Sequence, residues 1–481
     1  MTSARTIARN TSVRAFAEVL SKVASLAFYV VMARRLGPEG FGDFTFALSL
    51  ALLLTVFAGF GIDQVITRSV ARDPATARRL LTDALTVKVG FGLVGVAGAM
   101  LVVLAGGFDA DLRAAVALLS VAAVVELVTK NFAATFQGLD DMVPVAVSLL
   151  VQRFFTAAVG IALLLSGAGV VEVSVVYLAG AVLALAYIVV RLARRGISPE
   201  RTPSAARARA LVRGSFALGV TVIFSVALFR IDATLLSLIE GTAAVGIYGV
   251  AYRLFESTLF LSFVFVSALL PTLSRLTPDT SPTVGQVYEL GSKVMAAALL
   301  PLGTGFVLFA EPLVHVIYST EYDAAVDTVR LLGAAAVLYG VTYLASYVLI
   351  SQGRQIILPW ATAAVLAVNV ALNLVLIPRY SYDGAAAATS VSEALLAGTL
   401  VVAVRRIVGP VSLRRIVTGP LAGCAAMVAV ALVAGTGALV VVPAGLAYVA
   451  VLLAVERRLY LEDVKRALDT VRRRSALAGS G

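Results

Sequence analysis

The sequence predicts an all-α polytopic membrane protein, and three observations favour this fold class. Of the 481 residues, 60% are hydrophobic and 14% are charged, whereas about 25% of the residues in a typical soluble domain are charged. Apolar runs long enough to cross a hydrocarbon core of about 30 Å follow one another along almost the whole chain. None of them alternates polar and apolar residues as a barrel strand does.

We expect about 14 transmembrane helices. They are placed at residues 12–34, 41–67, 80–105, 112–136, 143–166, 170–191, 211–236, 243–271, 287–310, 325–351, 356–378, 384–405, 416–436 and 439–456. Arg5, Arg9 and Arg14 lead directly into the first helix, which is too long and too charged for a cleavable signal. We therefore expect the first helix to remain in the protein.

The first helix carries Arg14, Glu18 and Lys22 at intervals of four, so the three charges share one helical face. With about 1.5 Å of rise per residue from an edge near Ser12, Glu18 lies roughly 9 Å deep and Lys22 roughly 15 Å deep. Two charges at these depths cost about 5–7 kcal/mol, more than the about 3–5 kcal/mol gained from the Val, Leu and Phe residues of the helix. This face therefore contacts protein or water, and we expect it to line a polar interior.

Charges in the connections predict the orientation, because cytoplasmic loops carry an excess of Lys and Arg. If the N-terminus is cytoplasmic, twelve basic residues fall on the same side: Arg72, Arg78, Arg79, Arg194, Arg195, Arg201, Arg207, Arg209, Arg405, Arg406, Arg414 and Arg415. We expect both termini to lie on the cytoplasmic side of the inner membrane. The net charge of +11 then reflects contacts with anionic membrane lipids, and nucleic acid is not an expected partner.

Two short patterns recur in the second half of the chain. Residues 37–47 (GPEGFGDFTFA) match residues 241–251 (GTAAVGIYGVA) in the pattern G-x4-G-x-[FY]-x2-A. Residues 137–144 (QGLDDMVP) match residues 352–359 (QGRQIILP) in the pattern Q-G-x5-P. Both matches join segments six helices apart, so we expect a six-helix repeat whose two copies share one orientation.

The repeat predicts the domain organisation. We expect an N-terminal six-helix lobe (1–192), a basic cytoplasmic linker (193–210), a C-terminal six-helix lobe (211–406), two additional helices (407–456) and a basic cytoplasmic tail (457–481). Pro199 and Pro203 suit a flexible linker. The first part of the tail is basic and amphipathic, which favours binding to the inner leaflet.

Other ionisable residues also fall within the predicted spans. Lys88, Arg153, Arg253 and Glu393 each lie about 14–15 Å from an edge, and Glu256 follows Arg253 by one turn. Nearer a surface, where side chains can reach the interface, are Asp63, Lys130, Arg230, Asp232 and Arg330.

These charges have two interpretations. The structural one is a set of ion pairs that hold helices together, such as Glu18 with Lys22 or Arg253 with Glu256. The functional one is a cavity whose cations bind an anionic cargo and whose acids tune or release it. The candidate cavity residues are Arg14, Glu18, Lys22, Lys88, Arg153, Arg230, Asp232, Arg253, Glu256 and Glu393.

The two halves place their charges differently. A shift of 204 residues takes the stripe of the first helix to Leu218, Val222 and Val226, and takes Arg253 and Glu256 back to Ser49 and Leu52. The pattern of helices therefore repeats in the two halves, whereas the charged side chains do not. An asymmetric interior suits a large cargo with a polar head better than a small symmetric ion.

No cofactor is expected. Cys424 and His315 are each the only residue of their type, which leaves no partner for a disulfide or a metal site. The segment Gly37-x4-Gly42 is followed by Asp43 and Phe44, so it is not a nucleotide phosphate loop. We expect any driving force to come from an H⁺ or Na⁺ gradient, the membrane potential or removal of product.

Several segments together resemble the polysaccharide-export flippases of the multidrug/oligosaccharidyl-lipid/polysaccharide exporter superfamily. They are NTSVRAFAEVLSKVASLAFYVVMARRLGPEGFGDF, GFGIDQVITRSVAR, VGIYGVAYRLFE, LLPTLSRL, LVHVIYSTEYDAAV and NVALNLVLIPRYSYDGAAAATSVSEAL. The resemblance covers the first twelve predicted helices. It implies two six-helix lobes around a central cavity, with two further helices that only some members of the family have.

The resemblance also implies a function. Such proteins move a polyprenyl-pyrophosphate-linked oligosaccharide from the cytoplasmic to the outer leaflet, with glycosyltransferases or a polymerase of the same pathway as partners. The resemblance implies that the basic residues that bind the pyrophosphate in this family correspond here to Arg14, Lys22, Arg230 and Arg253. The related lipid II flippases have more arginine in the first helix, so we expect a cargo other than lipid II.

Three alternatives remain open. A drug/cation antiporter of the same superfamily would use a central acid such as Glu256 or Glu393. A membrane glycosyltransferase or polymerase would need a long outer loop with paired acids, and no predicted outer loop exceeds about 14 residues. A scaffold without transport activity would recruit glycosyltransferases.

Overall fold

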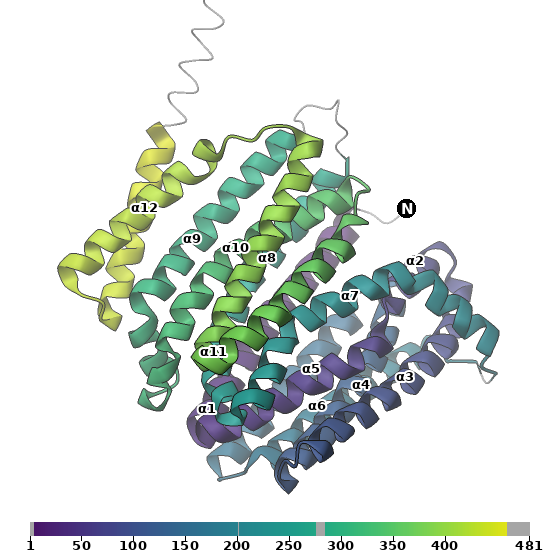
Figure 1. Cartoon of the computed structure of the whole chain (residues 1–481). Helices are drawn as coiled ribbons and strands as arrows, with labels where there is room; N and C mark the ends of the chain where they lie inside the picture. Colours follow the sequence, from purple (N-terminus) through teal and green to yellow (C-terminus); the bar gives the residue numbers. More distant parts are fainter. Residues whose placement is uncertain (1–3, 201, 276–283, 459–481) are drawn as a thin grey trace, which may run out of the picture.

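The computed structural model describes residues 4–200, 202–275 and 284–458, and in these ranges the chain forms helices, turns and short connections without strands (Figure 1). The α-helices are α1 (Ala4–Gly59), α2 (Ile62–Arg72), α3 (Ala77–Ala105), α4 (Ala110–Gly138), α5 (Val143–Leu165), α6 (Val170–Ala193), α7 (Ala205–Glu240), α8 (Thr242–Arg275), α9 (Val284–Ile317), α10 (Val326–Ser351), α11 (Ile357–Val408) and α12 (Leu413–Ala434). A last helix covers residues 441–458. Three 3₁₀ turns are η1 (Pro74–Thr76), η2 (Thr320–Ala325) and η3 (Ala438–Val440).

The described residues contain 12 helical stretches long and apolar enough to cross a membrane. Two of them, in α1 and α11, are bent near the middle, so that each accounts for two of the predicted crossings. The bend in α1 is at Gly37, with φ 66° and ψ −176°, directly before Pro38. The bend in α11 is at Ser381, with φ 50°, three residues after Pro378. The predicted all-α polytopic fold is confirmed.

The second predicted helix ends earlier than its apolar run suggests. It was expected over residues 41–67, but α1 stops at Gly59, and Phe60 and Gly61 adopt φ values of 38° and 66°. The chain then restarts as α2, a short amphipathic helix that buries Ile62, Ile66 and Val70. Hydropathy alone places the helix end later, because Ile62, Val65 and Ile66 continue the apolar residues beyond the turn, although the polar Asp63 and Gln64 lie between them.

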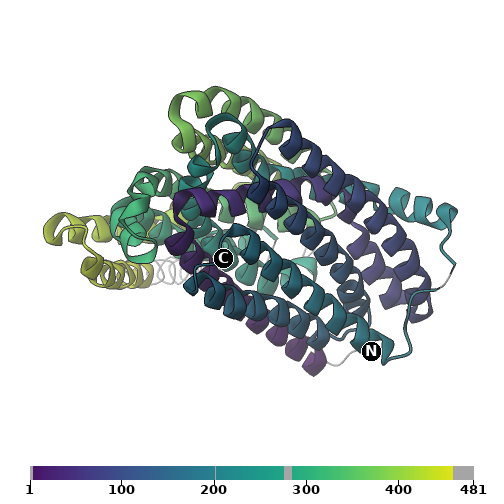
Figure 2. The ribbon, with the colours of Figure 1, turned by 90° about the horizontal axis from the view of Figure 1, so that it is seen from below.

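The helices form two groups, here called the N-half (α1–α6) and the C-half (α7–α11). In Figure 1 the N-half lies at the lower right and α8–α11 lie at the upper left. Helix α12 and the last helix form a pair at the outer edge of the C-half, and Figure 2 shows them projecting away from the N-half. We call the side where α1 begins the N-terminal face, and the side of its bend at Gly37 the far face.

Helix α7 belongs to both groups. Near its start, Ala208, Leu211 and Val212 pack in an apolar cluster with α2 and α3 of the N-half. Farther along, α7 packs against α11 of the C-half. Within the connection before it, the carbonyl oxygen of Glu200 accepts from the Thr82 hydroxyl of α3 at 3.2 Å. In the first turn of α7 itself, Arg207 forms an ion pair with Asp83 of α3 at 2.9 Å. The start of α7 is therefore docked on the N-half.

The first sequence repeat forms a close contact between the halves at the far face. A Cβ atom on Gly42 would lie 1.8 Å from the carbonyl oxygen of Thr242, and one on Gly246 would lie 1.8 Å from the carbonyl oxygen of Pro38. Gly42 corresponds to Gly246 in the repeat, and Pro38 corresponds to Thr242. The two contacts are therefore equivalent under a pseudo-two-fold operation, and glycine is required at both positions because any side chain would overlap backbone.

Side chains reinforce this far-face contact. The guanidinium of Arg34 on α1 donates from Nε to the carbonyl oxygen of Ile317 at 2.8 Å and from Nη2 to that of Val316. These are the last residues of α9, whose terminal carbonyls lack partners within the helix. The Tyr322 hydroxyl of η2 donates to the carbonyl oxygen of Ala33 at 3.0 Å. The far face is thus closed by contacts between the halves.

The second repeated pattern does not form equivalent contacts. A Cβ atom on Gly138, at the end of α4, would lie 2.8 Å from the carbonyl oxygen of Thr67. Its counterpart Gly353 has φ +70° and no atom within 4 Å of such a Cβ. In the first case glycine permits close packing, and in the second it permits a left-handed turn.

We predict that Gly42→Ala and Gly246→Ala each destabilise the protein by about 1–3 kcal/mol, because the added methyl group forces the halves apart. Thermal unfolding of the purified protein in detergent measures this effect. Gly398→Ala is the control, because Gly398 also lies within a helix and no atom lies within 4 Å of a Cβ there. This substitution should not destabilise the protein and should add at most about 1 kcal/mol of stability from the higher helix propensity of Ala. Equal melting temperatures for all three variants would contradict the proposed role of the contact.

Candidate functional site

A cavity of about 240 Å³ lies between α1 of the N-half and α8 of the C-half. Its walls are Val19, Lys22, Val23, Ser25, Leu26, Tyr29, Arg253, Glu256, Ser257 and Phe260. Its charged groups are Lys22 on one side and Arg253 and Glu256 on the other. The structure thus brings three of the predicted site residues into one cavity between the halves.

A short ionic network lies behind this cavity. Glu256 accepts from Arg253 at 2.7 Å and from Arg230 of α7 at 3.0 Å, so one carboxylate is bound by two guanidinium groups. The Arg253 guanidinium also lies over the Tyr29 ring, 3.7 Å from its centroid, across the boundary between the halves. This geometry suits a cation–π contact and fixes Arg253 at the cavity wall.

Lys22 is exposed and forms no ion pair with any residue in the described ranges. It is close enough to interact electrostatically with Glu256. Lys22, Arg230 and Arg253 together surround one carboxylate, so the site carries an excess of positive charge. An anion is the ligand that this excess favours.

The other two charges of the first helix lie outside this cavity. Arg14 and Glu18 are partly buried on α1, closer to its start, and line none of the cavities described here. Within the described part of the chain, Glu18 and Lys22 do not form the ion pair considered from the sequence, whereas Arg253 and Glu256 do. The network therefore combines a structural ion pair with a free cation.

Arg153 lies in a separate cluster inside the N-half. Its Nη1 donates to the Tyr177 hydroxyl at 3.3 Å, and that hydroxyl donates to Glu126 at 3.0 Å. Gln152 also donates to Glu126. Arg153 and Arg253 both interact electrostatically with Tyr29, so this cluster lies behind the cavity wall.

A second cavity, of about 290 Å³, lies between α1, α2 and α4 of the N-half and α7. Its walls include Leu52 and Val56 of α1 and Val226 of α7. These positions correspond, through the 204-residue repeat, to Glu256, Phe260 and Lys22 of the first cavity. The two cavities therefore occupy positions related by the internal repeat, but they are lined by different side chains. In the second cavity the polar groups are instead Asp63, Gln64, Glu126 and Lys130.

Lys88 does not face either cavity. Its ammonium group is fully buried and donates to Asp63 at 2.6 Å and to the carbonyl oxygen of Leu127 at 2.7 Å. Asp63 is 28% exposed and lines the second cavity. The arrangement matches the structural interpretation, an ion pair in which Lys88 holds α3 against α2 and α4.

Asp232 lies inside the C-half, away from the α1–α8 cavity, and is 1% exposed. It accepts hydrogen bonds from Thr389 at 2.5 Å, from Tyr248 at 3.1 Å and from Asn373 at 3.0 Å. The Asn373 amide also donates to Asn369 Oδ1 at 3.0 Å. The Asn373 Oδ1 atom is buried without a hydrogen-bond partner among the described residues.

Glu393 lies close to this polar cluster. It is 5% exposed and accepts from Thr342 at 3.1 Å. With Asn369, Thr389 and Tyr252 it lines a very small cavity of about 10 Å³. In the described ranges, no group of three or more His, Cys, Asp or Glu side chains is arranged to hold a metal ion. The oxygen atoms gathered around Asp232 come from its own carboxylate and from neighbouring amide and hydroxyl groups.

The neutral members of this cluster are not among the site residues predicted from the sequence. Asn369 and Asn373 are separated by four residues in an otherwise apolar stretch of α11, which places both amides on one face. Two amide side chains at this spacing within an apolar helix are the sequence pattern that could have indicated a buried polar cluster. Tyr248 and Thr389 carry no comparable signal, because their contacts depend on how three helices pack.

Comparisons with known proteins agree with this architecture. Residues 7–277 match the family model described as polysaccharide biosynthesis protein. A curated relative is the probable low-salt glycan biosynthesis flippase Agl15 of Haloferax volcanii, 24% identical over 242 residues. That match covers 49% of this chain and 50% of the relative, so it spans only about half of each protein.

Solved structures show the same fold. The lipid II flippase MurJ in an inward closed conformation superimposes with a TM-score of 0.75 over 93% of this chain and 99% of that chain, at 14% identity. An inward-facing multidrug resistance transporter of the MATE family, in the MOP superfamily, has a TM-score of 0.62 over 81% and 94% of the two chains, also at 14% identity. The compared proteins are flippases and transporters.

We predict that Asp63→Asn destabilises the protein by about 3–5 kcal/mol, because it leaves the buried Lys88 ammonium without its carboxylate. The double variant Asp63→Asn/Lys88→Met should recover most of that loss. Thermal unfolding in detergent measures both. The matched control is Asp327→Asn, which breaks an exposed ion pair with Arg330 and should cost about 0–1 kcal/mol. A double variant no more stable than the single one would argue against a purely structural pair.

Proposed function

Because the chain belongs to the polysaccharide biosynthesis protein family, we propose that it is a flippase for a polyprenyl-pyrophosphate-linked oligosaccharide. In this proposal it carries the lipid-linked sugar across the inner membrane by alternating access, for synthesis of a cell-surface polysaccharide. The observation that carries the proposal is the cationic cavity between the halves, where Lys22 and Arg253 face the same space. The chain itself is a multi-pass membrane protein with the fold of flippases and transporters.

The charge of the α1–α8 cavity fits a diphosphate. At an effective dielectric constant of 20, two unit charges 4 Å apart attract each other by about 4 kcal/mol. Arg230 and Arg253 share Glu256, but Lys22 has no ion-pair partner in the described ranges. An incoming diphosphate would bind Lys22 and compete with Glu256 for the two arginines, so the same carboxylate can help to release it.

The position of the cavity fits the amphipathic nature of the cargo. Each unpaired sugar hydroxyl costs several kcal/mol in hydrocarbon, so the head group needs a polar route, while the prenyl chain is most stable in lipid. The cavity lies between α1 and α8, and Val19 and Val23 on its α1 wall are exposed apolar residues. A head group held there would leave its tail next to an apolar surface.

We further propose that the buried cluster around Asp232 binds the coupling ion, Na⁺ or H⁺. Asp232, Asn369, Asn373 and Thr389 supply oxygen atoms from α7 and both parts of α11. Oxygen ligands with one negative charge suit a monovalent hard cation, and the unpartnered Asn373 Oδ1 would gain a partner. Asp232 and Arg230 are two residues apart on α7, which connects this cluster to the anion site.

The proposed orientation places both termini in the cytoplasm. The N-terminal face then carries the basic connections, as the positive-inside rule requires. The far face, closed in this structure by the Gly42 and Gly246 contacts, would be the outer gate. A closed outer gate corresponds to a protein ready to receive cargo from the cytoplasmic leaflet.

We predict that Lys22→Ala and Arg253→Ala each reduce export of lipid-linked sugar by about tenfold or more, because each removes one charge-assisted contact to the diphosphate. Surface polysaccharide and the intracellular pool of lipid-linked sugar are measured in cells, and immunoblots report the protein level in the membrane. Arg379→Ala, at an exposed position outside the cavities, is the matched control. Wild-type export in both cavity variants, or ethidium efflux in place of sugar export, would refute the proposal.

We predict that Na⁺ or acidic pH raises the melting temperature of the purified protein, and that Asp232→Asn abolishes this effect by removing the charge that binds the cation. Sodium and choline salts are compared at constant ionic strength, and pH is varied separately in choline. Asp383→Asn is the control, because Asp383 also accepts a hydrogen bond from a threonine, Thr328. An ion response that persists in Asp232→Asn would place the coupling site elsewhere.

A further inference from the structure

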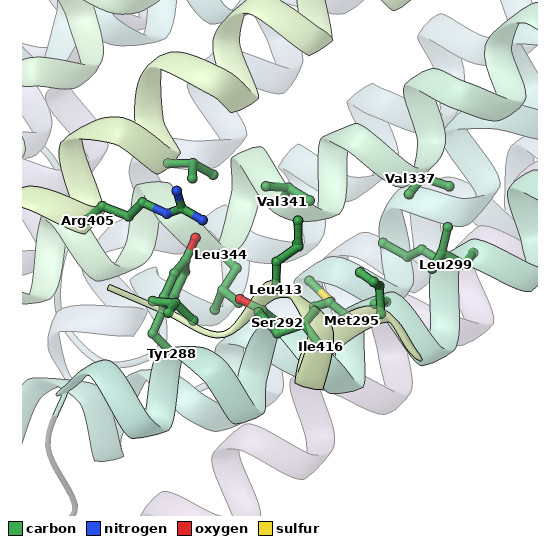
Figure 3. A pocket seen from close by; sticks show the side chains of 15 residues that line it. Tyr288, Ser292, Met295, Leu299, Val337, Val341, Leu344, Arg405, Leu413 and Ile416 are labelled. Atoms are coloured by element: carbon green, nitrogen blue, oxygen red, sulfur yellow. The ribbon is translucent and has the colours of Figure 1, made fainter. Parts of the chain in front are cut away.

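A narrow apolar slot of about 200 Å³ lies among α9, α10, α11 and α12, away from the α1–α8 cavity. Its walls are mostly aliphatic, including Met295, Leu299, Val337, Val341 and Leu344. Along α9 it extends from Tyr288 to Leu299, a length of about 16 Å. In Figure 3 the aliphatic side chains line one end and the middle of this slot.

The other end of the slot is polar and cationic. Figure 3 shows the Arg405 guanidinium directed toward the Tyr288 hydroxyl, with Ser292 on the same helix one turn away. Arg405 lies in the last turn of α11, so this end of the slot reaches the N-terminal face. Arg405 is exposed and has no ion pair with any residue of the described ranges.

The surroundings of this end are also basic. Arg406 follows Arg405, and Arg414 and Arg415 begin α12. The nearest carboxylate along α9, Glu289, accepts from the backbone N–H of Ser412 at 3.3 Å. Lys293 is already paired with Glu456 of the last helix. Positive charge therefore exceeds negative charge at this end of the slot.

An apolar slot with one cationic end requires an amphipathic occupant. Water is disfavoured along the aliphatic part, because it finds too few hydrogen-bond partners there. An empty slot would leave its walls without van der Waals contacts. Basic pockets between transmembrane helices are a known form of binding site for anionic lipid head groups.

We propose that this slot binds an anionic phospholipid of the leaflet at the N-terminal face. One acyl chain lies along α9 between Met295 and Leu299 and the facing residues of α10. The phosphate accepts hydrogen bonds from Arg405 and the Tyr288 hydroxyl. Because α12 forms one wall, the bound lipid also holds the outer helical pair against the C-half.

The proposal is tested on the full-length protein purified from nanodiscs that contain equal amounts of phosphatidylglycerol and phosphatidylcholine. Native mass spectrometry then counts the lipids retained by each variant. Arg405→Gln removes the proposed phosphate contact. Arg406→Gln is the matched control, because it removes the adjacent arginine, which does not line the slot. Val341→Trp fills the slot and leaves every charge in place.

The wild-type protein and Arg406→Gln should each retain one phosphatidylglycerol in preference to phosphatidylcholine. Arg405→Gln should lower this retention by about tenfold, the effect of losing one charge-assisted contact, and Val341→Trp should abolish it. Equal retention of the two lipids, or full retention by Arg405→Gln, would overturn the proposal. Displacement of the bound lipid by a polyprenyl phosphate with the same dependence on Arg405 would overturn it too, by assigning the slot to the cargo.

Discussion

The central constraint on this molecule is the cost of placing charge inside a membrane. A bilayer tolerates buried ions only when they are paired or face a polar space. Here the same rule produces two outcomes: Lys88 is sealed against Asp63, whereas Lys22 and Arg253 face a cavity between the halves. The position of each cation relative to the α1–α8 boundary decides which outcome applies.

The internal repeat explains how one scaffold provides both closure and asymmetry. At the far face, the repeat-related positions Gly42 and Gly246 make equivalent backbone contacts, so the symmetry is kept where the halves must meet. Deeper in the molecule, Lys22 corresponds to Val226 and Glu256 corresponds to Leu52. The two cavities are related by the repeat, but only one of them has cations on facing walls.

Patterns among residues close together in the sequence predicted the fold well, because the long apolar runs and the repeated glycines each determine structure over short distances. They also placed Lys22, Arg253 and Glu256 among ten candidate cavity residues, and the structure brings these three into one cavity. They failed where the outcome depends on packing between distant helices. The break at Phe60 and Gly61 was missed because Ile62, Val65 and Ile66 extend the apolar pattern beyond it. Asp232 is held by groups from α8 and α11, and no pattern near Asp232 itself predicts those partners.

Helix α7 links the movements of the two halves, because it is packed against both. Leu211 near its start is packed among residues of the N-half, while Asp232 near its end is bound within the C-half. Because both ends of α7 are held, rotation of one half against the other must tilt or bend this helix. Arg230 lies on the same helix, one helical turn or less from Asp232. Any movement of the halves therefore shifts the guanidinium that binds Glu256, which makes the strength of the anion site depend on the angle between them.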